Sequence, residues 1–450
     1  MLLKNCYLVR EDFQGKVDIR IEGEKVKEIG EWLKPKDREE VIDIEGKLVT
    51  PGGIDLHVHL ALPVAETVSC DDFYTGTKAA LAGGTTTVVD FVHPERGESI
   101  VDAIEKRLKE VKEPCCDYSF HIAIVEVNER VERELDGIKG FHSIKLYTGY
   151  LKTVGLNFRE LERAFELASK NNLIIHLHAE LGEKVEARLN RFVKEGKNSP
   201  KFHPLLRPSE EEGEAVKKAI ELAIKYNTEL YIVHISCEDA LKEVKKGKER
   251  YDRLYGETCP HYLYLDRSLY ELEDRVAVRY VLSPPLRRAK DRDSLWNGIK
   301  EGTIDTIATD HCPFTIEQKI NGLRKNNLGL IPGGGPGIQE RFPIVLTEAL
   351  NDKISLERAV ELCCSNPSKI MRRYPKKGTV KVGSDADIVV WERVKPETTF
   401  KKVKLITKAN YTLYPDFKVK VLPERVFLRG VEVYHKGEFY NEGRGKFLKG

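Results

Sequence analysis

Apolar and polar residues alternate with a period of two at both ends of the chain, and glycines interrupt the pattern. The stretches that show it are residues 16–30, 40–52, 378–392, 402–414 and 425–439. Successive side chains of a β-strand point to opposite faces, so this alternation predicts short strands with one buried face. We therefore predict that residues 1–50 and 372–450 join into one β-sandwich domain.

Residues 51–371 follow a different pattern, in which short apolar runs alternate with charged stretches of helical period. Residues 158–171 and 210–226, for example, carry apolar residues at i, i+3 and i+4, as amphipathic helices do. The runs predicted as strands are 54–60, 85–92, 118–125, 143–147, 173–180, 230–237, 256–265 and 304–311. Eight strands that alternate with helices predict an α/β fold, a TIM-like (β/α)8 barrel whose active-site loops follow the C-terminal ends of the strands.

The composition excludes several classes of protein. Hydrophobic residues make up 41% of the chain, charged residues 32%, and the formal net charge is +2. This balance gives no overall field that would attract nucleic acid or an anionic membrane, so we expect neither as a partner. The nine cysteines show no disulfide or zinc spacing, and the N-terminal residues lack an apolar signal segment. We expect a cytoplasmic protein with buried thiols.

Side chains of the metal-binding kind recur where the predicted strands end. His57 and His59 share one face of the first strand, because alternate residues of a strand point the same way. His178, His234 and Asp310 lie near the ends of the fifth, sixth and eighth strands. In a closed barrel these five side chains would meet at one mouth. Imidazole and carboxylate are usual ligands of zinc and similar ions, so the pattern predicts a divalent-metal site.

Lys145 has two interpretations. On the fourth strand it would point to the same mouth, but its ammonium would repel a cation, and a structural ion pair is the alternative.

The ordered motifs resemble a known family. "PGGIDLHVHL", "SIKLYTGY", "HLHAE", "YIVHIS" and "ATDHCPF" occur in the order found in cyclic amidohydrolases of the amidohydrolase superfamily, especially dihydropyrimidinase and hydantoinase. The resemblance covers nearly the whole chain, from "KVDIRIEGEKVKEIG" to "GTVKVGSDADIVVWE". It implies a binuclear metal-dependent hydrolase that converts dihydropyrimidines or 5-substituted hydantoins, which are small cyclic amides, into N-carbamoyl amino acids. It also implies a homotetramer.

The resemblance further implies a role for each candidate residue. Two divalent ions, zinc by expectation, would be bound by His57, His59, Lys145, His178, His234 and Asp310. Lys145, carbamylated by carbon dioxide, would bridge both ions as an anionic oxygen ligand. Asp310 would act as general base and then acid, and Tyr150 would donate a hydrogen bond to the developing oxyanion. Ser283, through main-chain groups in "SPPLR", and Gly333 would hold the amide of the ring. The alternatives are that Tyr150 is a tyrosine on the rim of the barrel and that Ser283 belongs to a simple proline turn.

Departures from the family pattern bear on the substrate. Dihydroorotase typically carries an arginine, and allantoinase often an asparagine, where this chain has Ala61. Alanine cannot bind a carboxylate, which favours a neutral ring. Dihydroorotase or allantoinase activity is the alternative, followed by a non-catalytic scaffold of the dihydropyrimidinase-related kind. Gly333 stands where hydantoinases usually carry asparagine, so that contact survives only if the main chain makes it. The loop 61–73 lacks the family's glycine pair.

Overall fold

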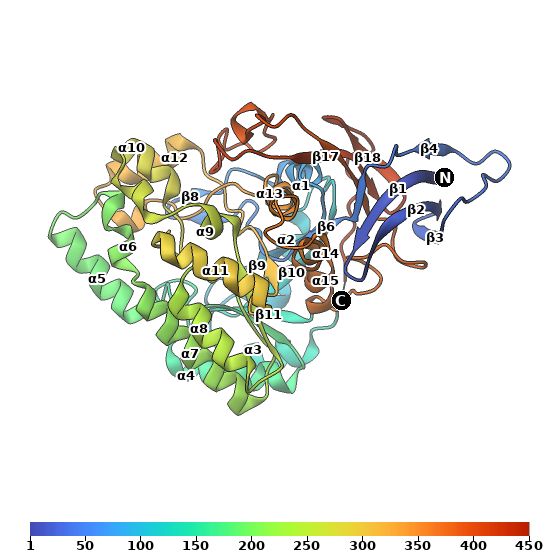
Figure 1. The fold of residues 1–450 in the computed structure, drawn as a ribbon. Coiled ribbons are helices and arrows are strands. Elements are labelled where there is room, and N and C mark those ends of the chain that lie inside the picture. Colours follow the sequence, from blue (N-terminus) through green and yellow to red (C-terminus); the bar gives the residue numbers. More distant parts are fainter. Residues whose placement is uncertain (450) are drawn as a thin grey trace.

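The structure, a computed structural model that describes residues 1–449, contains a parallel barrel and a separate mixed sheet (Figure 1). The eight barrel strands, in hydrogen-bonded order, are β6 (Gly53–Asp55), β9 (Thr85–Val92), β10 (Asp117–Ala123), β11 (Ser143–Tyr147), β12 (Ile174–His178), β13 (Leu230–Ile232), β14 (Leu254–Thr258) and β15 (Thr306–Ile307). Every pairing in this order is parallel. The predicted TIM-like barrel is therefore confirmed.

The seam between the first and the last barrel strand is closed by a side chain. β6 and β15 stand at the two ends of the hydrogen-bonded order. Arg341, which is completely buried, donates from Nη1 to the carbonyl oxygens of Ile54 (2.9 Å) and Ile307 (2.8 Å). Just beyond the strands, the amide of His59 donates to the carbonyl of His311 at 2.8 Å. One guanidinium thus joins the two strand ends across the gap.

Helices follow the barrel strands and cover the outside of the sheet. The longer ones are α1 (Phe73–Ala82), α2 (Ile100–Glu110), α3 (Glu129–Gly137), α4 (Phe158–Lys170), α5 (Gly182–Lys194), α7 (Ser209–Tyr226), α8 (Glu238–Lys248), α11 (Ala289–Glu301), α12 (Ile316–Arg324) and α13 (Arg341–Ala349). Shorter ones are α6 (His203–Leu206), α9 (Pro260–Tyr264), α10 (Asp274–Ala277), α14 (Leu356–Val360) and α15 (Asn366–Ile370). Helix α4 starts where its sequence predicts, since Asn157 and Glu160 form a capping box.

The two ends of the chain build the second sheet together. Its strands are β1 (Leu2–Arg10), β2 (Phe13–Glu22), β3 (Lys25–Gly30), β4 (Val41–Asp43), β5 (Leu48–Pro51), β16 (Ile388–Arg393), β17 (Val421–Leu428), β18 (Val431–His435) and β19 (Glu438–Phe439). The N- and C-terminal parts meet where β5 pairs antiparallel with β16. Figure 1 shows β1 to β3 (blue) on the side of the molecule opposite helices α4, α7 and α8. The exact domain limits, 1–50 with 372–450 and 51–371, stay a prediction.

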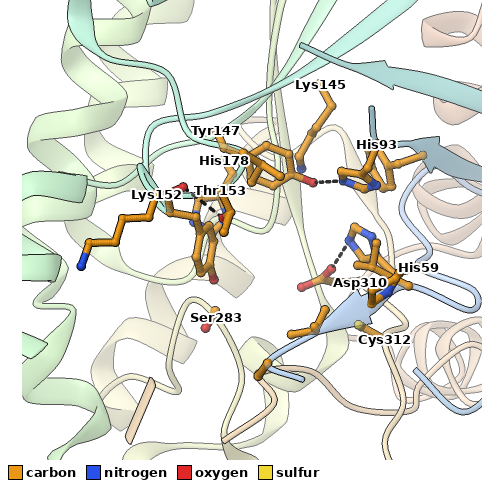
Figure 2. A pocket seen from close by; sticks show the side chains of 18 of the residues that line it. His59, His93, Lys145, Tyr147, Lys152, Thr153, His178, Ser283, Asp310 and Cys312 are labelled. Carbon is orange, nitrogen blue, oxygen red and sulfur yellow. Dashed lines mark hydrogen bonds and ion pairs between the residues drawn. The ribbon is translucent and has the colours of Figure 1, made fainter. Parts of the chain in front are cut away.

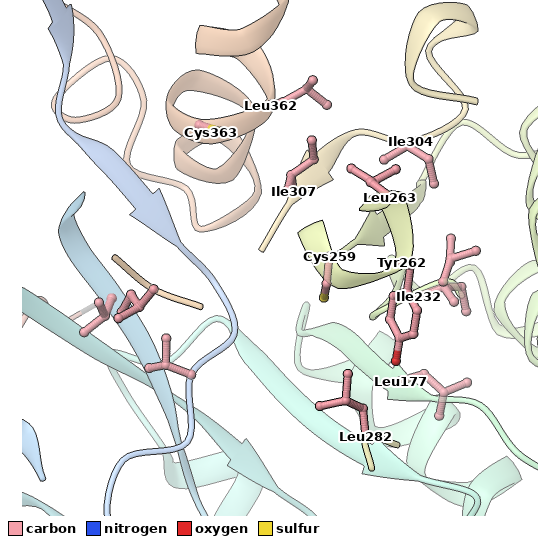
Figure 3. Close-up of a cluster of buried hydrophobic side chains, with 14 of the residues drawn as sticks. Leu177, Ile232, Cys259, Tyr262, Leu263, Leu282, Ile304, Ile307, Leu362 and Cys363 are labelled. Atoms are coloured by element: carbon pink, nitrogen blue, oxygen red, sulfur yellow. The ribbon is translucent and has the colours of Figure 1, made fainter. Parts of the chain in front are cut away.

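The apolar core lies between the barrel strands and their helices. Figure 3 shows part of it, in which Leu177 of β12, Ile232 of β13, Ile307 of β15 and Leu263 of α9 belong to one cluster. The nine cysteines are free thiols, and all of them except Cys70 are buried. No helix within residues 1–449 combines the length and the apolar character needed to cross a bilayer.

Several segments differ from the predicted strands. Residues 260–264, predicted as the end of the seventh strand, form helix α9, because Pro260 takes the first helical position, where a missing N–H costs nothing. Residues 402–414 form no strand but lie against the barrel. There the amide of Ile406 donates to Gln339 Oε1 at 2.9 Å. The first strand is also shorter than predicted, so that His57 and His59 follow β6 instead of lying on it.

Candidate active site

A cavity of about 1130 Å³ lies at the C-terminal ends of the barrel strands. Its wall contains every residue that the sequence predicted for the site: His57, His59, Lys145, Tyr150, His178, His234, Ser283, Asp310 and Gly333. Lys145 lies in the middle of β11 and His178 ends β12, whereas His234 and Asp310 follow β13 and β15 by two and three residues. The barrel therefore gathers side chains that are up to 276 positions apart, from residue 57 to residue 333.

The first group of candidate ligands consists of His57, His59 and Asp310. Their ligand atoms all lie within 4.8 Å of one another. Asp310 Oδ1 is 3.0 Å from His59 Nε2 and 3.3 Å from His57 Nε2. Figure 2 shows Asp310 directed at His59, with Ser283 on the opposite wall of the cavity. Two imidazoles and one carboxylate at this spacing form a set that suits a divalent cation.

The second group lies beside the first. His178 Nδ1 and His234 Nε2 are 2.8 Å apart, and the rings of His57 and His234 stack with their centroids 5.5 Å apart. Burial lowers the pKa of His57 and His234 well below the usual range, so both rings are neutral and offer a lone pair. His57 and His234 are thus in the form that metal binding requires.

Lys145 lies between the two groups and is fully buried. Its Nζ is 3.5 Å from His57 Nε2, and burial lowers its pKa to about 8. Within residues 1–449 no carboxylate lies within ion-pair distance of this amine, which removes the structural ion pair offered as the alternative interpretation. An uncompensated ammonium at full burial is costly, whereas an anionic carbamate between two cations is not. The donor set therefore fits a pair of divalent ions.

Buried carboxylates orient the candidate ligands. Glu257 Oε1 accepts a hydrogen bond from His57 Nδ1 at 2.8 Å, and the same carboxylate accepts from the amide of His234 (2.9 Å) and the hydroxyl of Tyr231 (2.7 Å). Glu180 Oε2 accepts from His178 Nε2 at 2.9 Å. Each carboxylate binds one ring nitrogen, so that His57 Nε2 and His178 Nδ1 are left for a metal.

Two polar residues next to the candidate ligands were not predicted from the sequence. Glu257 lies next to His57 because it is on β14, the seventh barrel strand. A partial signal was available: the seventh strand, like the second and third, had no assigned group, and "GETCP" carries one carboxylate. Arg207 forms an ion pair with Glu180, and its guanidinium lies 5.1 Å from the ring centre of Tyr150. It lies outside any predicted strand, so no pattern indicated it.

Tyr150, Ser283 and Gly333 border the cavity beside the candidate metal site. The rings of Tyr150 and His178 lie 5.3 Å apart, and burial raises the pKa of the Tyr150 hydroxyl, which keeps it protonated as a donor. A Cβ atom added to Gly333 would come within 2.9 Å of Ser283 Oγ. Any larger residue at position 333 would have to displace Ser283, so the segments around the two residues are in direct contact.

Other histidines and Cys312 have roles that differ from those of the ligands. His176 is not part of the cavity wall, and its ring centre lies 3.9 Å from that of His121. His93 lines the cavity and is hydrogen-bonded to the hydroxyl of Tyr147 at 2.8 Å. Cys312 also lines the cavity, and burial raises its pKa well above the usual value. Its thiol is therefore protonated, which argues against a role as nucleophile.

Comparison with known proteins gives a consistent result. The model of the "Amidohydrolase family" matches residues 48–422. A D-hydantoinase from Ralstonia pickettii is 37% identical over 100% of this chain and 98% of its own length. The crystal structure of a dihydropyrimidinase from Brevibacillus agri covers the whole chain with a TM-score of 0.96 at 34% identity, and 98% of that protein is matched. A D-hydantoinase (dihydropyrimidinase) from Thermus sp. gives a TM-score of 0.94 at 33% identity, with the same coverage.

Proposed function

Because this chain belongs to the amidohydrolase family, we propose that it hydrolyses the cyclic amide bond of 5-substituted hydantoins or dihydropyrimidines, with N-carbamoyl amino acids as products. The observation that carries this proposal is the convergence of His57, His59 and Asp310 on one point of a large cavity. Full-length relatives named D-hydantoinase and dihydropyrimidinase support it. The enzyme is therefore a cyclic amidase that depends on a divalent metal.

We propose two such ions, with zinc as the metal. His57, His59 and Asp310 would hold the more buried ion, and His178 and His234 the more exposed one, with carbamylated Lys145 shared between them. The buried, unpaired amine of Lys145 and the neutral imidazoles of His57 and His234 support this arrangement. When bound, such a pair of cations polarises a carbonyl group and lowers the pKa of water to about 7.

Asp310 carries the proton during the reaction. Its carboxylate would take a proton from the attacking water as the oxygen joins the carbonyl carbon of the ring. It would then deliver that proton to the ring nitrogen as the C–N bond breaks, so the same group is first base and then acid. Tyr150, which burial keeps protonated, would donate a hydrogen bond to the oxyanion that develops on the carbonyl oxygen.

The ring amide would be held by main-chain groups of Ser283 and Gly333. The contact between the two segments supports this, because it places both backbones on one wall of the cavity. A side chain at position 333 would require the hydroxyl of Ser283 to move, and Gly333 itself offers only its main chain to a substrate. Glycine at position 333, where hydantoinases usually carry asparagine, is therefore compatible with a main-chain contact to the ring amide.

A neutral ring is the favoured substrate. Ala61 lines the cavity and offers no cation to a carboxylate, which argues against dihydroorotate. The cavity lining also includes apolar side chains that a substituent on the ring can contact, namely Leu62, Val64, Leu189, Leu328 and Ile331. The six candidate metal ligands are all present and converge, which argues against a non-catalytic scaffold.

The test is ring opening by purified, zinc-loaded protein in bicarbonate buffer. We expect turnover of dihydrouracil and of 5-phenylhydantoin, and none of dihydroorotate or allantoin, with each product measured by chromatography. Turnover of dihydroorotate alone would contradict the assignment based on Ala61. Inactivity towards all four rings, in protein shown to carry two ions per chain, would reject the proposed substrate class.

We also propose a homotetramer, as the family resemblance implies. Multi-angle light scattering at micromolar protein should give four times the chain mass of 51.3 kDa. A mass equal to one chain would contradict this proposal without affecting the assignment of the active site.

A further inference from the structure

A buried lysine outside the cavity joins the two segments proposed to bind the ring. Lys319 lies on α12, and its side chain is completely buried. Its Nζ donates to the carbonyl oxygen of Val281 at 3.0 Å and to that of Pro332 at 3.1 Å. Val281 precedes Ser283 by two residues, and Pro332 directly precedes Gly333. One amine therefore holds both segments at once.

The two segments meet at further points next to this amine. The amide of Gly334 donates to the carbonyl of Val281 at 3.1 Å, so that this oxygen accepts two hydrogen bonds. Gly333 and Ser283 touch closely enough that a Cβ at position 333 would lie 2.9 Å from Ser283 Oγ. The carbonyl oxygen of Pro332, by contrast, accepts a hydrogen bond from the side-chain amine of Lys319. Loss of the amine would leave the segment around Gly333 with one fewer contact to its neighbour.

The electrostatic setting of Lys319 indicates that the amine does more than fill space. Within the described part of the chain no carboxylate forms an ion pair with it, and burial lowers its pKa to about 7. A methionine of similar length would pack there without the cost of burying an amine. Both the neutral and the charged amine have at least two N–H groups, which match the two carbonyls. Lys319 can therefore keep both hydrogen bonds on either side of neutral pH.

Gln318, which precedes Lys319, forms hydrogen bonds with a different part of the cavity wall. Gln318 donates from Nε2 to Thr67 Oγ1 at 2.7 Å and to the carbonyl of Val68 at 2.8 Å. These belong to the hairpin of β7 (Pro63–Val64) and β8 (Thr67–Val68), whose first strand lines the cavity. Neighbouring residues of one helix thus hold two different walls, so each is a control for the other.

We propose that Lys319 is a positioning residue that keeps the main chains of Ser283 and Gly333 at the spacing needed to bind the amide of the ring. This inference rests on the proposed function, because it takes those segments as the ring-binding wall. Since Lys319 touches neither the cavity nor any candidate ligand, its loss should weaken ring binding and leave metal content and the chemical step largely intact.

The experiment compares Lys319→Met with Gln318→Glu and wild type. Gln318 also accepts from the amide of Thr315 at the start of α12, and glutamate keeps this acceptor while it removes the donor to the hairpin. Unsubstituted hydantoin and 5-phenylhydantoin serve as substrates, and uracil, an unsaturated ring with the same imide, serves as a ligand for calorimetry. For Lys319→Met we expect KM for both substrates and Kd for uracil to rise about tenfold, with kcat within about threefold of wild type. For Gln318→Glu we expect unchanged values with hydantoin and uracil, and a raised KM for 5-phenylhydantoin alone. Metal content should stay equal in all three proteins.

The outcomes separate this inference from the proposed function. If wild type opens no ring yet binds uracil more tightly than Lys319→Met does, the function is wrong and the positioning role stands. If Lys319→Met lowers only the melting temperature, with wild-type KM and Kd, its role is structural and the inference is overturned. If Lys319→Met does not fold, Lys319→Gln, which keeps a donor, should give values of KM and Kd above wild type. The inference would also be overturned if Lys319→Gln had the same KM and Kd as wild type, or if wild type did not bind uracil.

Discussion

Replacement of Asp310 by asparagine should lower kcat by about a thousand-fold or more. Asparagine keeps the size of the side chain but can neither accept the proton of the attacking water nor deliver it to the ring nitrogen. It also removes the only anionic member of the group that Asp310 forms with His57 and His59. The measurement is steady-state turnover of 5-phenylhydantoin, together with metal content by mass spectrometry.

Asp305→Asn is the matched control for this variant. Asp305 lies just before β15, outside the cavity wall, and it accepts from Lys248 Nζ at 2.6 Å and from the amide of Gly256 at 2.7 Å. Its substitution removes a similar carboxylate from the other end of the same strand, so kcat should stay within about threefold of wild type. Equal losses of kcat in the two variants would show that Asp310 acts only through stability.

Replacement of Lys145 by alanine should remove activity and metal together. If its carbamate is shared between the two ions, the variant loses an anionic ligand from both, and bound metal should fall from about two ions per chain to about one or fewer. Turnover should fall by about a thousand-fold, the scale expected when a charged group is removed from a dry site. A short carboxylate such as propionate, which fits the space left by the side chain, should restore part of the activity and part of the bound metal.

The modification itself can be observed without an activity assay. Wild-type protein equilibrated with ¹³C-labelled bicarbonate should show a carbamate carbon by NMR, and Lys145→Ala should not. Lys152→Ala is the control, because this lysine borders the same cavity but is exposed to solvent, and Figure 2 shows its amine directed away from Asp310. Full metal content in Lys145→Ala, or an unchanged carbamate signal, would refute the bridging role.

The sequence was sufficient for the barrel and the candidate ligands for a physical reason. Strand order along the chain is also strand order around a parallel barrel, so residues near successive strand ends must meet at one mouth. His178 and Asp310 could therefore be placed together although 132 positions separate them. The mixed sheet was predictable because alternation with period two appears at both ends of the chain.

What the sequence did not indicate depends on contacts between distant segments. Nothing local marks Glu257 as the partner of His57, or Lys319 as the donor to Val281 and Pro332, because both roles arise only after the chain has folded. Residues 402–414 alternate like a strand, yet their partners are side chains of the barrel. The period of a pattern predicts which face is buried, but it cannot predict what covers that face.

Arg341 also bears on the order in which the molecule can be completed during synthesis. A growing chain that has reached residue 300 already carries His57, His59, Lys145, His178 and His234, but neither Asp310 nor the guanidinium that holds Ile54 against Ile307. The mixed sheet is completed later still, because β5 pairs with β16, which begins at Ile388. The barrel and the mixed sheet are therefore completed only by the last third of the chain. A ribosome-bound fragment that lacks this third has an open barrel and an incomplete set of ligands.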